Sequence, residues 1–154
     1  MPNNTADTVW DFTSAEYEEI RKILKKYPLN YKQSACIPLL WIAQKHNDNW
    51  IPLSAMNKIA EILEIHPMRV YEVATFYTMF NRQKIGKYHL QVCGTTPCMV
   101  RGSDEVFRAI KDYAGIVQGE TSKNKMFTCD EVECLAACAN APMMQVNNEE
   151  VYVK

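Results

Sequence analysis

The sequence predicts a helical N-terminal domain at residues 1–81, followed by a second domain of helices and strands at residues 82–154. Apolar residues recur at the spacing of amphipathic helices in the first part, whereas alternating strand-forming residues, 88–92, open the second part. A chain of 154 residues that is 47% hydrophobic is long enough to bury a core in two small domains. The expected fold class is therefore α+β or α/β, with a helical bundle placed before the sheet.

The first two helices have clear boundaries in the sequence. Thr13 and Glu16 match a capping box at the start of the first helix, and Pro28 ends that helix because proline has no backbone N–H to donate. A second helix is expected over residues 35–44, whose apolar side chains give it a buried face. It ends before the turn-forming run Asn47-Asp48-Asn49.

Two further helices complete the predicted N-terminal domain. Ser54 is the expected N-cap of the third helix because its hydroxyl can accept a hydrogen bond from the backbone. Pro67 suits the first turn of a fourth helix that is expected to reach Phe80. The apolar residues between Val70 and Phe80 cover more than one face of that helix, so we expect some of them to contact a partner.

The second domain is predicted to mix strands with a helix. Residues 88–92 alternate as a strand does, and the apolar spacing of residues 103–113 predicts a helix after it. Further short strands are expected at residues 126–132, 143–146 and 151–153. Asn147 and Asn148 form a turn between the last two strands. A strand followed by a helix indicates an α/β unit.

Charge and hydropathy exclude several kinds of partner. With 17 basic and 18 acidic residues the net charge is −1, so no overall field attracts nucleic acid or an anionic membrane. The longest apolar stretches, Ile37–Ala43 and Val73–Phe80, are too short to cross a bilayer, and we expect no direct membrane insertion. Residues 1–10 match neither a secretory signal nor a mitochondrial presequence, so no targeting sequence is visible.

The six cysteines are the most unusual feature of the composition. Cys36 stands alone, and the other five all fall in the last third of the chain. A secreted disulfide scaffold is usually shorter and follows a signal peptide, which does not fit this sequence. We therefore expect a reducing compartment and thiolates that bind metal.

Two cysteine pairs carry the strongest chemical signal, Cys93-Gly-Thr-Thr-Pro-Cys98 and Cys134-Leu-Ala-Ala-Cys138. Each pair follows a predicted strand, so each is expected on a loop. Four thiolates, two for each iron, are the ligands of a 2Fe-2S cluster. The small residues between the cysteines let backbone N–H groups approach the sulfurs and stabilise their negative charge. The sequence favours one 2Fe-2S cluster on these four cysteines and no catalytic residue.

Two other chemistries compete with this interpretation. Zinc also binds four cysteines, but its usual sites have two residues between paired cysteines, unlike either pair in this chain. Thiol-redox proteins normally use a Cys-x-x-Cys pair at the start of a helix, and the sequence has none. Buried free cysteines or a chance disulfide would explain two compact pairs poorly. Three classes of protein therefore have to be distinguished: an electron-transfer subunit, a zinc-stabilised interaction module and a thiol-redox protein.

The sequence resembles the 24 kDa subunit of respiratory complex I, the NADH:ubiquinone oxidoreductase, whose bacterial counterpart is the E-type subunit. The mitochondrial members are the most similar. The resemblance runs from about Ser34 onwards and rests on four segments. These segments are Pro67–Phe80, Gly86–His89, Cys93–Cys98 and Val132–Met143.

This resemblance implies a thioredoxin-like C-terminal domain whose 2Fe-2S cluster is ligated at the four matched cysteines. It also implies an electron-transfer subunit, not catalytic alone, beside a flavoprotein that binds FMN and oxidises NADH. FMN and NADH are expected in that partner only, and the chain indeed lacks a Gly-rich dinucleotide fingerprint. The other partners would be peripheral-arm subunits on the matrix side of the mitochondrial inner membrane. Similar subunits serve soluble NAD-dependent hydrogenases and formate dehydrogenases, which stay as alternatives.

Two departures from the family pattern matter. Ala136 stands where a glycine is expected, so a positive φ at this position would strain the second cysteine loop. The chain also stops at Lys154, where the family usually continues through another strand and helix. We expect a shortened C-terminal domain that lacks some interface residues.

The remaining cysteines and the histidines have ordinary structural interpretations. Cys129 alternates with strand residues and Cys36 lies on an apolar helix, so both are expected to pack in the core. His46, His66 and His89 are scattered without partners at metal-binding spacing. None of these five side chains is expected to be catalytic.

Overall fold

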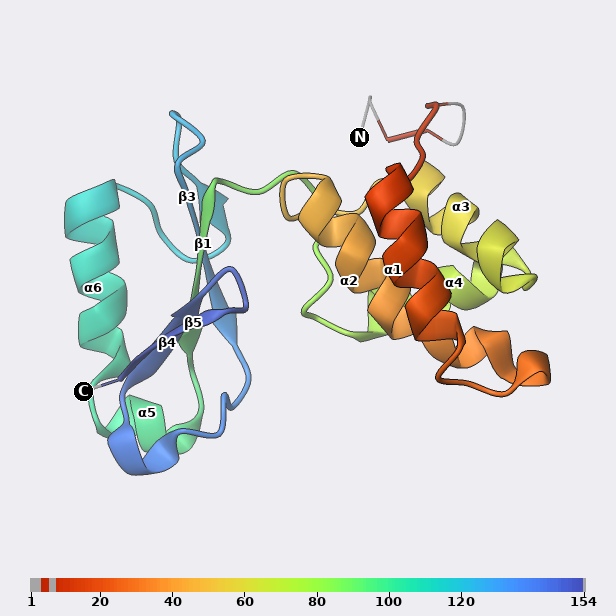
Figure 1. Cartoon of the computed structure of the whole chain (residues 1–154). Helices are drawn as coiled ribbons and strands as arrows, with labels where there is room; N and C mark the ends of the chain where they lie inside the picture. The colour runs from red at the N-terminus through yellow and green to blue at the C-terminus, as the bar shows by residue number, and fades with distance from the viewer. Residues whose placement is uncertain (1–3, 6–7, 154) are drawn as a thin grey trace. The chain divides into compact units, whose positions relative to one another are not determined.

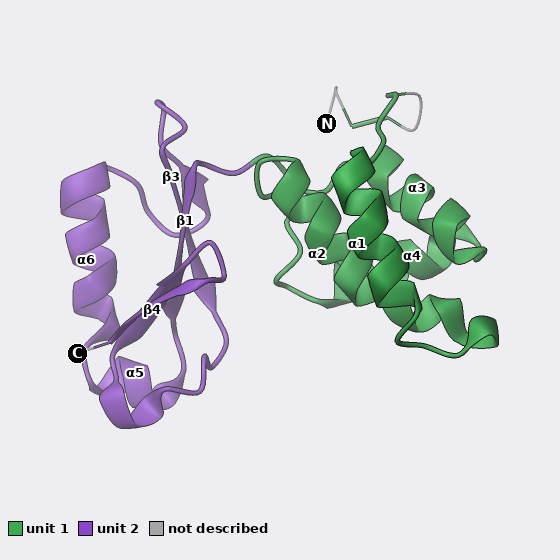
Figure 2. Ribbon diagram, in the orientation of Figure 1, with its two compact units in different colours: residues 1–84 green, residues 85–154 purple. Residues whose placement is uncertain are grey.

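The computed structural model describes residues 4–5 and 8–153 of the chain. The chain divides into two compact units, Met1–Lys84 and Ile85–Lys154, which Figure 2 shows in separate colours. The domain boundary expected between residues 81 and 82 stays a prediction. The expected ends of the two domains, at Met1 and Lys154, lie outside the described residues.

The first unit consists of helices that surround one apolar core (Figure 1). They are α1 (Ser14–Leu24), the 3-10 helix η1 (Leu29–Ala35), α2 (Cys36–His46), α3 (Leu53–Leu63) and α4 (Pro67–Phe76). The side chains of Ile20, Leu40, Ile59 and Val70 bring one residue from each α-helix into this core. Full burial of such a side chain stabilises the fold by about 1.5–3 kcal/mol. The four predicted α-helices are confirmed, and η1 is an addition.

The capping box predicted for α1 is present. The backbone N–H of Thr13 donates to Glu16 Oε2 at 2.7 Å, and the backbone N–H of Glu16 donates to Thr13 Oγ1 at 3.4 Å. The helix ends at Leu24, so Pro28 does not itself end it as predicted. Pro28 is the N-cap of η1. After α2, Asp48 and Asn49 adopt positive φ, so the predicted break at the asparagines is confirmed.

Two details of the predicted N-terminal domain are wrong. Ser54 does not cap α3, because the helix already begins at Leu53 behind Pro52 and the Ser54 hydroxyl has no hydrogen-bond partner among the described residues. The fourth helix does not reach Phe80 but ends at Phe76. The Gln44 side chain explains the early end, since it bonds the Met79 carbonyl at 3.1 Å and the Asn81 N–H at 2.8 Å. These two bonds hold the backbone around Phe80 outside a helix and leave its ring buried.

The second unit is a five-stranded mixed sheet in the order β2-β3-β1-β4-β5. The strands are β1 (Tyr88–Cys93), β2 (Glu120–Thr121), β3 (Phe127–Val132), β4 (Met143–Val146) and β5 (Glu150–Val153). Its helices are α5 (Thr96–Val100), α6 (Ser103–Ala114) and the 3-10 helix η2 (Cys138–Asn140). Among the described strands, β1 and β3 pair in parallel and the other neighbours are antiparallel. The predicted strands and the long helix are confirmed, whereas α5, β2 and η2 are additions.

The two faces of the sheet differ in polarity because side chains alternate along each strand. Leu90 and Val92 of β1 lie on the face that α6 covers, where Ile110 of α6 joins them in an apolar cluster. The other face carries His89, whose Nε2 lies 2.7 Å from Asp130 Oδ2. The apolar face against α6 fixes the register of β1 and β3, and thereby the place where each strand ends.

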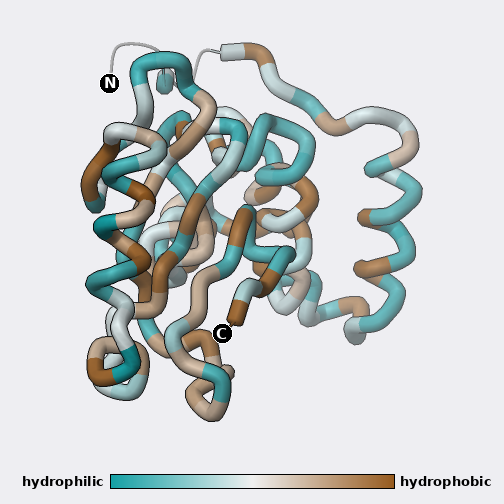
Figure 3. The backbone as a smooth tube through the Cα atoms, turned by 90° about the vertical axis from the view of Figure 1, so that its left-hand side faces the viewer, coloured by the Kyte–Doolittle hydropathy of each residue, from teal (hydrophilic) through white to brown (hydrophobic). Residues whose placement is uncertain are grey.

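The helices of both units carry hydrophobic and hydrophilic residues. Figure 3 shows hydrophilic and hydrophobic residues interleaved along the backbone. In α6, for example, Ile110 is buried while Tyr113 is exposed. Within the described residues no helix is long and apolar enough to cross a bilayer.

Candidate metal centre

The first cysteine pair is built into regular structure. Cys93 is the last residue of β1 and Cys98 lies inside α5, so this pair is not on an open loop as the sequence predicted. Thr95 is the N-cap of α5, and Pro97 sits in the first turn, where its missing N–H costs nothing. Both cysteines are completely buried, and each thiol affects the pKa of the other.

The second pair lies on the irregular segment that follows β3. Cys134 and Cys138 are both exposed, and their sulfurs are 3.5 Å apart. Between them Ala136 adopts a φ of 64°, in the left-handed region. Its N–H donates to Cys134 Sγ at 3.4 Å, so the unusual backbone turns this donor towards a sulfur. The predicted strain at Ala136 therefore has its structural basis, because an alanine has a steric cost in this region that a glycine avoids.

Strand topology brings the two pairs to the same edge of the sheet. β1 and β3 are parallel neighbours, and Cys93 is paired with Val132 at their carboxyl ends. The segments that follow the two strands must then leave side by side, as α5 and the chain around η2 do in Figure 1. The two pairs are close enough to interact electrostatically, because Cys138 raises the pKa of Cys98 and Cys93 raises the pKa of Cys138. Each pair supplies two sulfurs, and among the described residues no group of three or more His, Cys, Asp or Glu side chains is placed to hold a metal ion.

The four thiols differ in their electrostatic surroundings. Burial raises the pKa of the Cys93 thiol, but the Thr95 hydroxyl and the N–H groups of Thr95 and Leu135 outweigh it, so that pKa is lowered. At Cys98, burial and then the neighbouring Cys93 thiol raise the pKa. At Cys138, the hydrogen bond with Cys134 is the main cause of a raised pKa. Cys93 is thus a sulfur whose negative charge the protein stabilises, in contrast to Cys98 and Cys138.

This donor set fits a 2Fe-2S cluster. Such a cluster takes two thiolates on each iron, and the chain offers two pairs. Donors to the sulfurs are already in place, from the Thr95 and Leu135 backbone at Cys93 and from Met143 at Cys98. They would stabilise the charge on the ligands. Gly94 keeps the first turn open, since a Cβ there would lie 1.9 Å from Glu131 Oε1.

The other predicted residues have structural roles. Cys36 and Cys129 are buried in apolar clusters that contain none of the four predicted ligands, and burial raises the pKa of each thiol to about 11. His46 lies 2.9 Å from Glu16 Oε1, and His66 caps α4 by accepting the Met68 N–H at its Nδ1. His89 bonds Asp130, while its buried Nδ1 has no partner in the described part of the chain.

The sequence did not reveal which groups surround the sulfurs. The Thr95 hydroxyl lies 3.1 Å from Cys93 Sγ, and Leu135 and Met143 contribute backbone N–H groups that no side-chain pattern encodes. A threonine directly before a Thr-Pro helix start was the available signal for the first of these.

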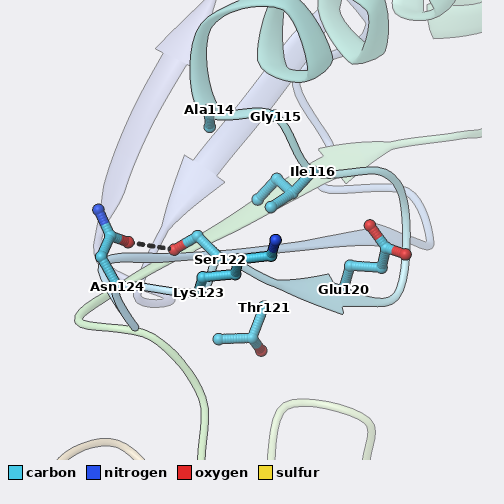
Figure 4. Close-up of a pocket in the computed structure, with 8 residues that line it drawn as sticks. All are labelled: Ala114, Gly115, Ile116, Glu120, Thr121, Ser122, Lys123 and Asn124. Atoms are coloured by element: carbon cyan, nitrogen blue, oxygen red, sulfur yellow. Dashed lines mark hydrogen bonds between the residues drawn. The ribbon is translucent and has the colours of Figure 1, made fainter.

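A pocket of about 650 Å³ lies elsewhere in the second unit. Figure 4 shows it between the end of α6 and the β2 turn, with the Ser122 hydroxyl bonded to Asn124 Oδ1 at 2.7 Å. Glu120 and Lys123 supply its charges. None of its lining residues is a cysteine, so this pocket is separate from the candidate metal centre.

Sequence comparisons show the family to which the chain belongs. A family model described as Thioredoxin-like [2Fe-2S] ferredoxin matches residues 20–154. The chain is 54% identical over 147 residues to mitochondrial NADH dehydrogenase [ubiquinone] flavoprotein 2 of Dictyostelium discoideum. That match covers 96% of the chain but 60% of the Dictyostelium protein. The E-type NADH-quinone oxidoreductase subunit of Rickettsia typhi is 46% identical, with 97% of the chain and 88% of that protein covered.

Solved structures share the fold. A chain of an H2-reduced NAD+-reducing [NiFe]-hydrogenase matches 71% of this chain and 18% of its own length, with a TM-score of 0.60 and 15% identity. A chain of the air-oxidised enzyme matches 79% and 21%, with a TM-score of 0.63 and 12% identity. At these identities the likeness concerns the fold alone.

Proposed function

Because the chain belongs to the thioredoxin-like 2Fe-2S ferredoxin family, we propose that it is an electron-transfer subunit of an NADH-oxidising respiratory complex. The family implies a 2Fe-2S cluster. We assign Cys93, Cys98, Cys134 and Cys138 as its ligands. The observation that carries this assignment is the meeting of two cysteine pairs at the carboxyl ends of the parallel strands β1 and β3.

The residues around this site suit electron transfer rather than bond chemistry. A bound 2Fe-2S cluster accepts and returns one electron at a time. Cys93 and Cys98 are completely buried, so this side of the site keeps water away from the sulfurs. Cys134 and Cys138 are exposed, so the other side lies near the protein surface, where electrons can enter and leave. The site needs no general acid or base for this task.

The partner that supplies electrons is, in this proposal, a flavoprotein that binds FMN and oxidises NADH. The names of the Dictyostelium and Rickettsia relatives place those proteins in NADH dehydrogenase complexes, which supports the choice. FMN and NADH would bind the partner only. Further partners would be peripheral-arm subunits of complex I, on the matrix side of the mitochondrial inner membrane.

Exposed aromatic residues at the end of α4 suit the contact with this partner. Phe76 is 78% exposed and Tyr77 is 40% exposed, and their rings meet edge to face with centroids 5.1 Å apart. Met68, at the start of the same helix, is 53% exposed. Exposed aromatic residues of this kind often contribute most of the binding energy of an interface. We propose that the partner binds both this end of α4 and the unit that carries the cysteines.

Two alternatives remain beside this function. An equivalent subunit of a soluble NAD-dependent hydrogenase or formate dehydrogenase would use the same four cysteines, and chains of an NAD+-reducing [NiFe]-hydrogenase share the fold. A zinc-stabilised interaction module would use the same ligands without electron transfer. The identity of the flavoprotein partner distinguishes the first alternative from the proposed function. Metal analysis distinguishes the second alternative from it.

Co-expression with an FMN-binding, NADH-oxidising subunit of complex I tests the proposal. We expect the two chains to co-purify and Phe76→Ala to weaken the complex at least about tenfold, because a buried aromatic anchor contributes about 2 kcal/mol or more. Leu29→Ala is the matched control, since Leu29 is 91% exposed in the same unit but lies on η1. Failure to co-purify, or equal weakening by both substitutions, would contradict this interface.

A further inference from the structure

The hydroxyl of Thr95 is not used in the way its position suggests. A threonine at an N-cap normally accepts a hydrogen bond from a backbone N–H in the first helical turn. Thr95 has the extended N-cap backbone of α5, with φ −79° and ψ 160°, yet its side chain makes no capping bond. The turn is closed instead by the Met99 N–H, which donates to the Thr95 carbonyl at 3.0 Å. The hydroxyl is therefore available to another group.

That group is the sulfur of Cys93. Thr95 Oγ1 lies 3.1 Å from Cys93 Sγ, two residues earlier in the chain. In the free thiol either atom could donate, but a thiolate bound to iron has no proton. The threonine hydroxyl must then be the donor, and the sulfur the acceptor.

Burial strengthens this hydrogen bond. Cys93 is completely buried, so water does not compete for its sulfur, and a hydrogen bond to a charged group is stronger in such surroundings. The backbone N–H groups of Thr95 and Leu135 also favour the charged form of this sulfur and lower its pKa. The backbone donors are fixed by the fold, whereas the hydroxyl depends on which residue occupies position 95.

We propose that Thr95 is a positioning residue that raises the reduction potential of the 2Fe-2S site through its hydrogen bond to Cys93. The inference rests on the proposed function, because it takes Cys93 as a cluster ligand. On reduction one electron enters the site, no bond to Thr95 forms or breaks, and no proton moves. The added negative charge is shared with the thiolates, and a donor to Cys93 Sγ stabilises the reduced form more than the oxidised form.

Thr96 provides a matched control in the same turn. It is the first residue of α5 and is exposed, and its hydroxyl makes no hydrogen bond to a described residue. Replacing either threonine by valine keeps the branched shape and removes only the hydroxyl. A difference between the two valine variants therefore reports the hydrogen bond at position 95 rather than a general effect of the turn.

The test is an EPR-monitored redox titration of the full chain, purified without oxygen, in four forms: wild type, Thr95→Val, Thr95→Ser and Thr96→Val. We expect Thr95→Val to shift the equilibrium between the two redox states about tenfold towards the oxidised form. For one electron this lowers the reduction potential by about 59 mV. Thr95→Ser keeps a hydroxyl and should stay close to wild type, as should Thr96→Val. An unchanged potential in Thr95→Val, or an equal fall in both valine variants, would overturn the proposal.

Iron and sulfide analysis of the same samples separates this inference from the proposed function. A wild-type chain without iron and sulfide would overturn both. A loaded cluster whose potential ignores position 95 would overturn only the role of Thr95. If Thr95→Val fails to hold iron, Thr95→Ala gives a second hydroxyl-free variant. If both lose the cluster while Thr95→Ser keeps it, the hydroxyl is required for binding, and the assignment as a tuning residue is wrong.

Discussion

The two cysteine pairs have similar spacing in the sequence and opposite surroundings in the fold. Cys93 and Cys98 are completely buried at the end of β1 and in α5, whereas Cys134 and Cys138 are exposed on irregular backbone after β3. The first pair is held by regular structure and core packing. The second is held by a short segment in which Ala136 has positive φ. Similar ligand motifs can thus differ widely in how firmly the protein holds them before any metal binds.

The largest effect should come from removing a ligand of either pair. Cys93→Ser and Cys138→Ser should each abolish stable cluster binding, because the site then has three thiolates in place of four. Cys129→Ser is the control, since Cys129 is buried against α6 and is not a ligand in this assignment. Visible absorbance of anaerobically purified protein measures the outcome. Loss of the spectrum in Cys129→Ser would refute the ligand set.

A smaller effect is expected from filling the first turn. In Gly94→Ala the new Cβ would lie 1.9 Å from Glu131 Oε1 and 2.5 Å from its Cγ, so the Glu131 side chain must move. We expect the free energy of unfolding to fall by about 1 kcal/mol, the low end of the cost of overpacking, because Glu131 is exposed and its flexible side chain can move aside. Urea unfolding of the iron-free protein measures this.

Glu131→Ala supplies the control for that change. If the clash with Glu131 is the cause, Gly94→Ala should cost much less in the Glu131→Ala background, and a double-mutant cycle gives the coupling. Additive effects of the two substitutions would contradict the steric explanation.

The difference in burial predicts a difference in thiol accessibility. In iron-free protein, Cys134 and Cys138 should be alkylated at least about tenfold faster than Cys93 and Cys98, because a local opening that costs about 1.4 kcal/mol already slows a buried thiol tenfold. The lowered pKa of Cys93 acts in the opposite direction, but its sulfur must first become accessible. Mass spectrometry of peptides during alkylation at about pH 8 measures the four rates. Equal rates would show that the first pair is not held by the fold.

The smallest predicted effect concerns Ala136. Ala136→Gly should raise the free energy of unfolding of the iron-free protein by about 1 kcal/mol, because glycine adopts the φ of 64° without steric cost. Ala137→Gly is the matched control, since Ala137 has a φ of −104° and gains nothing from glycine. That variant should lose about 0.4–1 kcal/mol through the larger entropy of the unfolded chain. Urea unfolding of both variants distinguishes them, and destabilisation by Ala136→Gly would contradict the strain.

Periodicity and capping patterns were enough to predict the elements that have their own sequence signals. The capping box at Thr13 and the helix behind Pro67 were found because each uses a local pattern. The end of α4 was not predictable in this way, because Gln44 sets it from another helix. Ser54 looked like a cap, but Pro52 had already begun the helix. Contacts between segments distant in the sequence decided the details that local patterns missed.

The candidate metal centre was likewise predictable only where local sequence carried the signal. Residue type and spacing were enough to identify the four cysteines and the possible backbone strain at Ala136. The unequal burial of the two pairs could not, because it depends on α5, a five-residue helix too short to leave a periodic pattern. The link between Thr95 and Cys93 was equally hidden, since a threonine at a helix start predicts a cap and here bonds a sulfur.

Metal analysis of the anaerobically purified chain, combined with EPR after reduction by dithionite, tests the central claim most directly. The account predicts about two irons and two sulfides per chain and the EPR signal of a reduced 2Fe-2S cluster. One zinc per chain, without sulfide and without an EPR signal, would contradict it and make the four cysteines the ligands of a structural site.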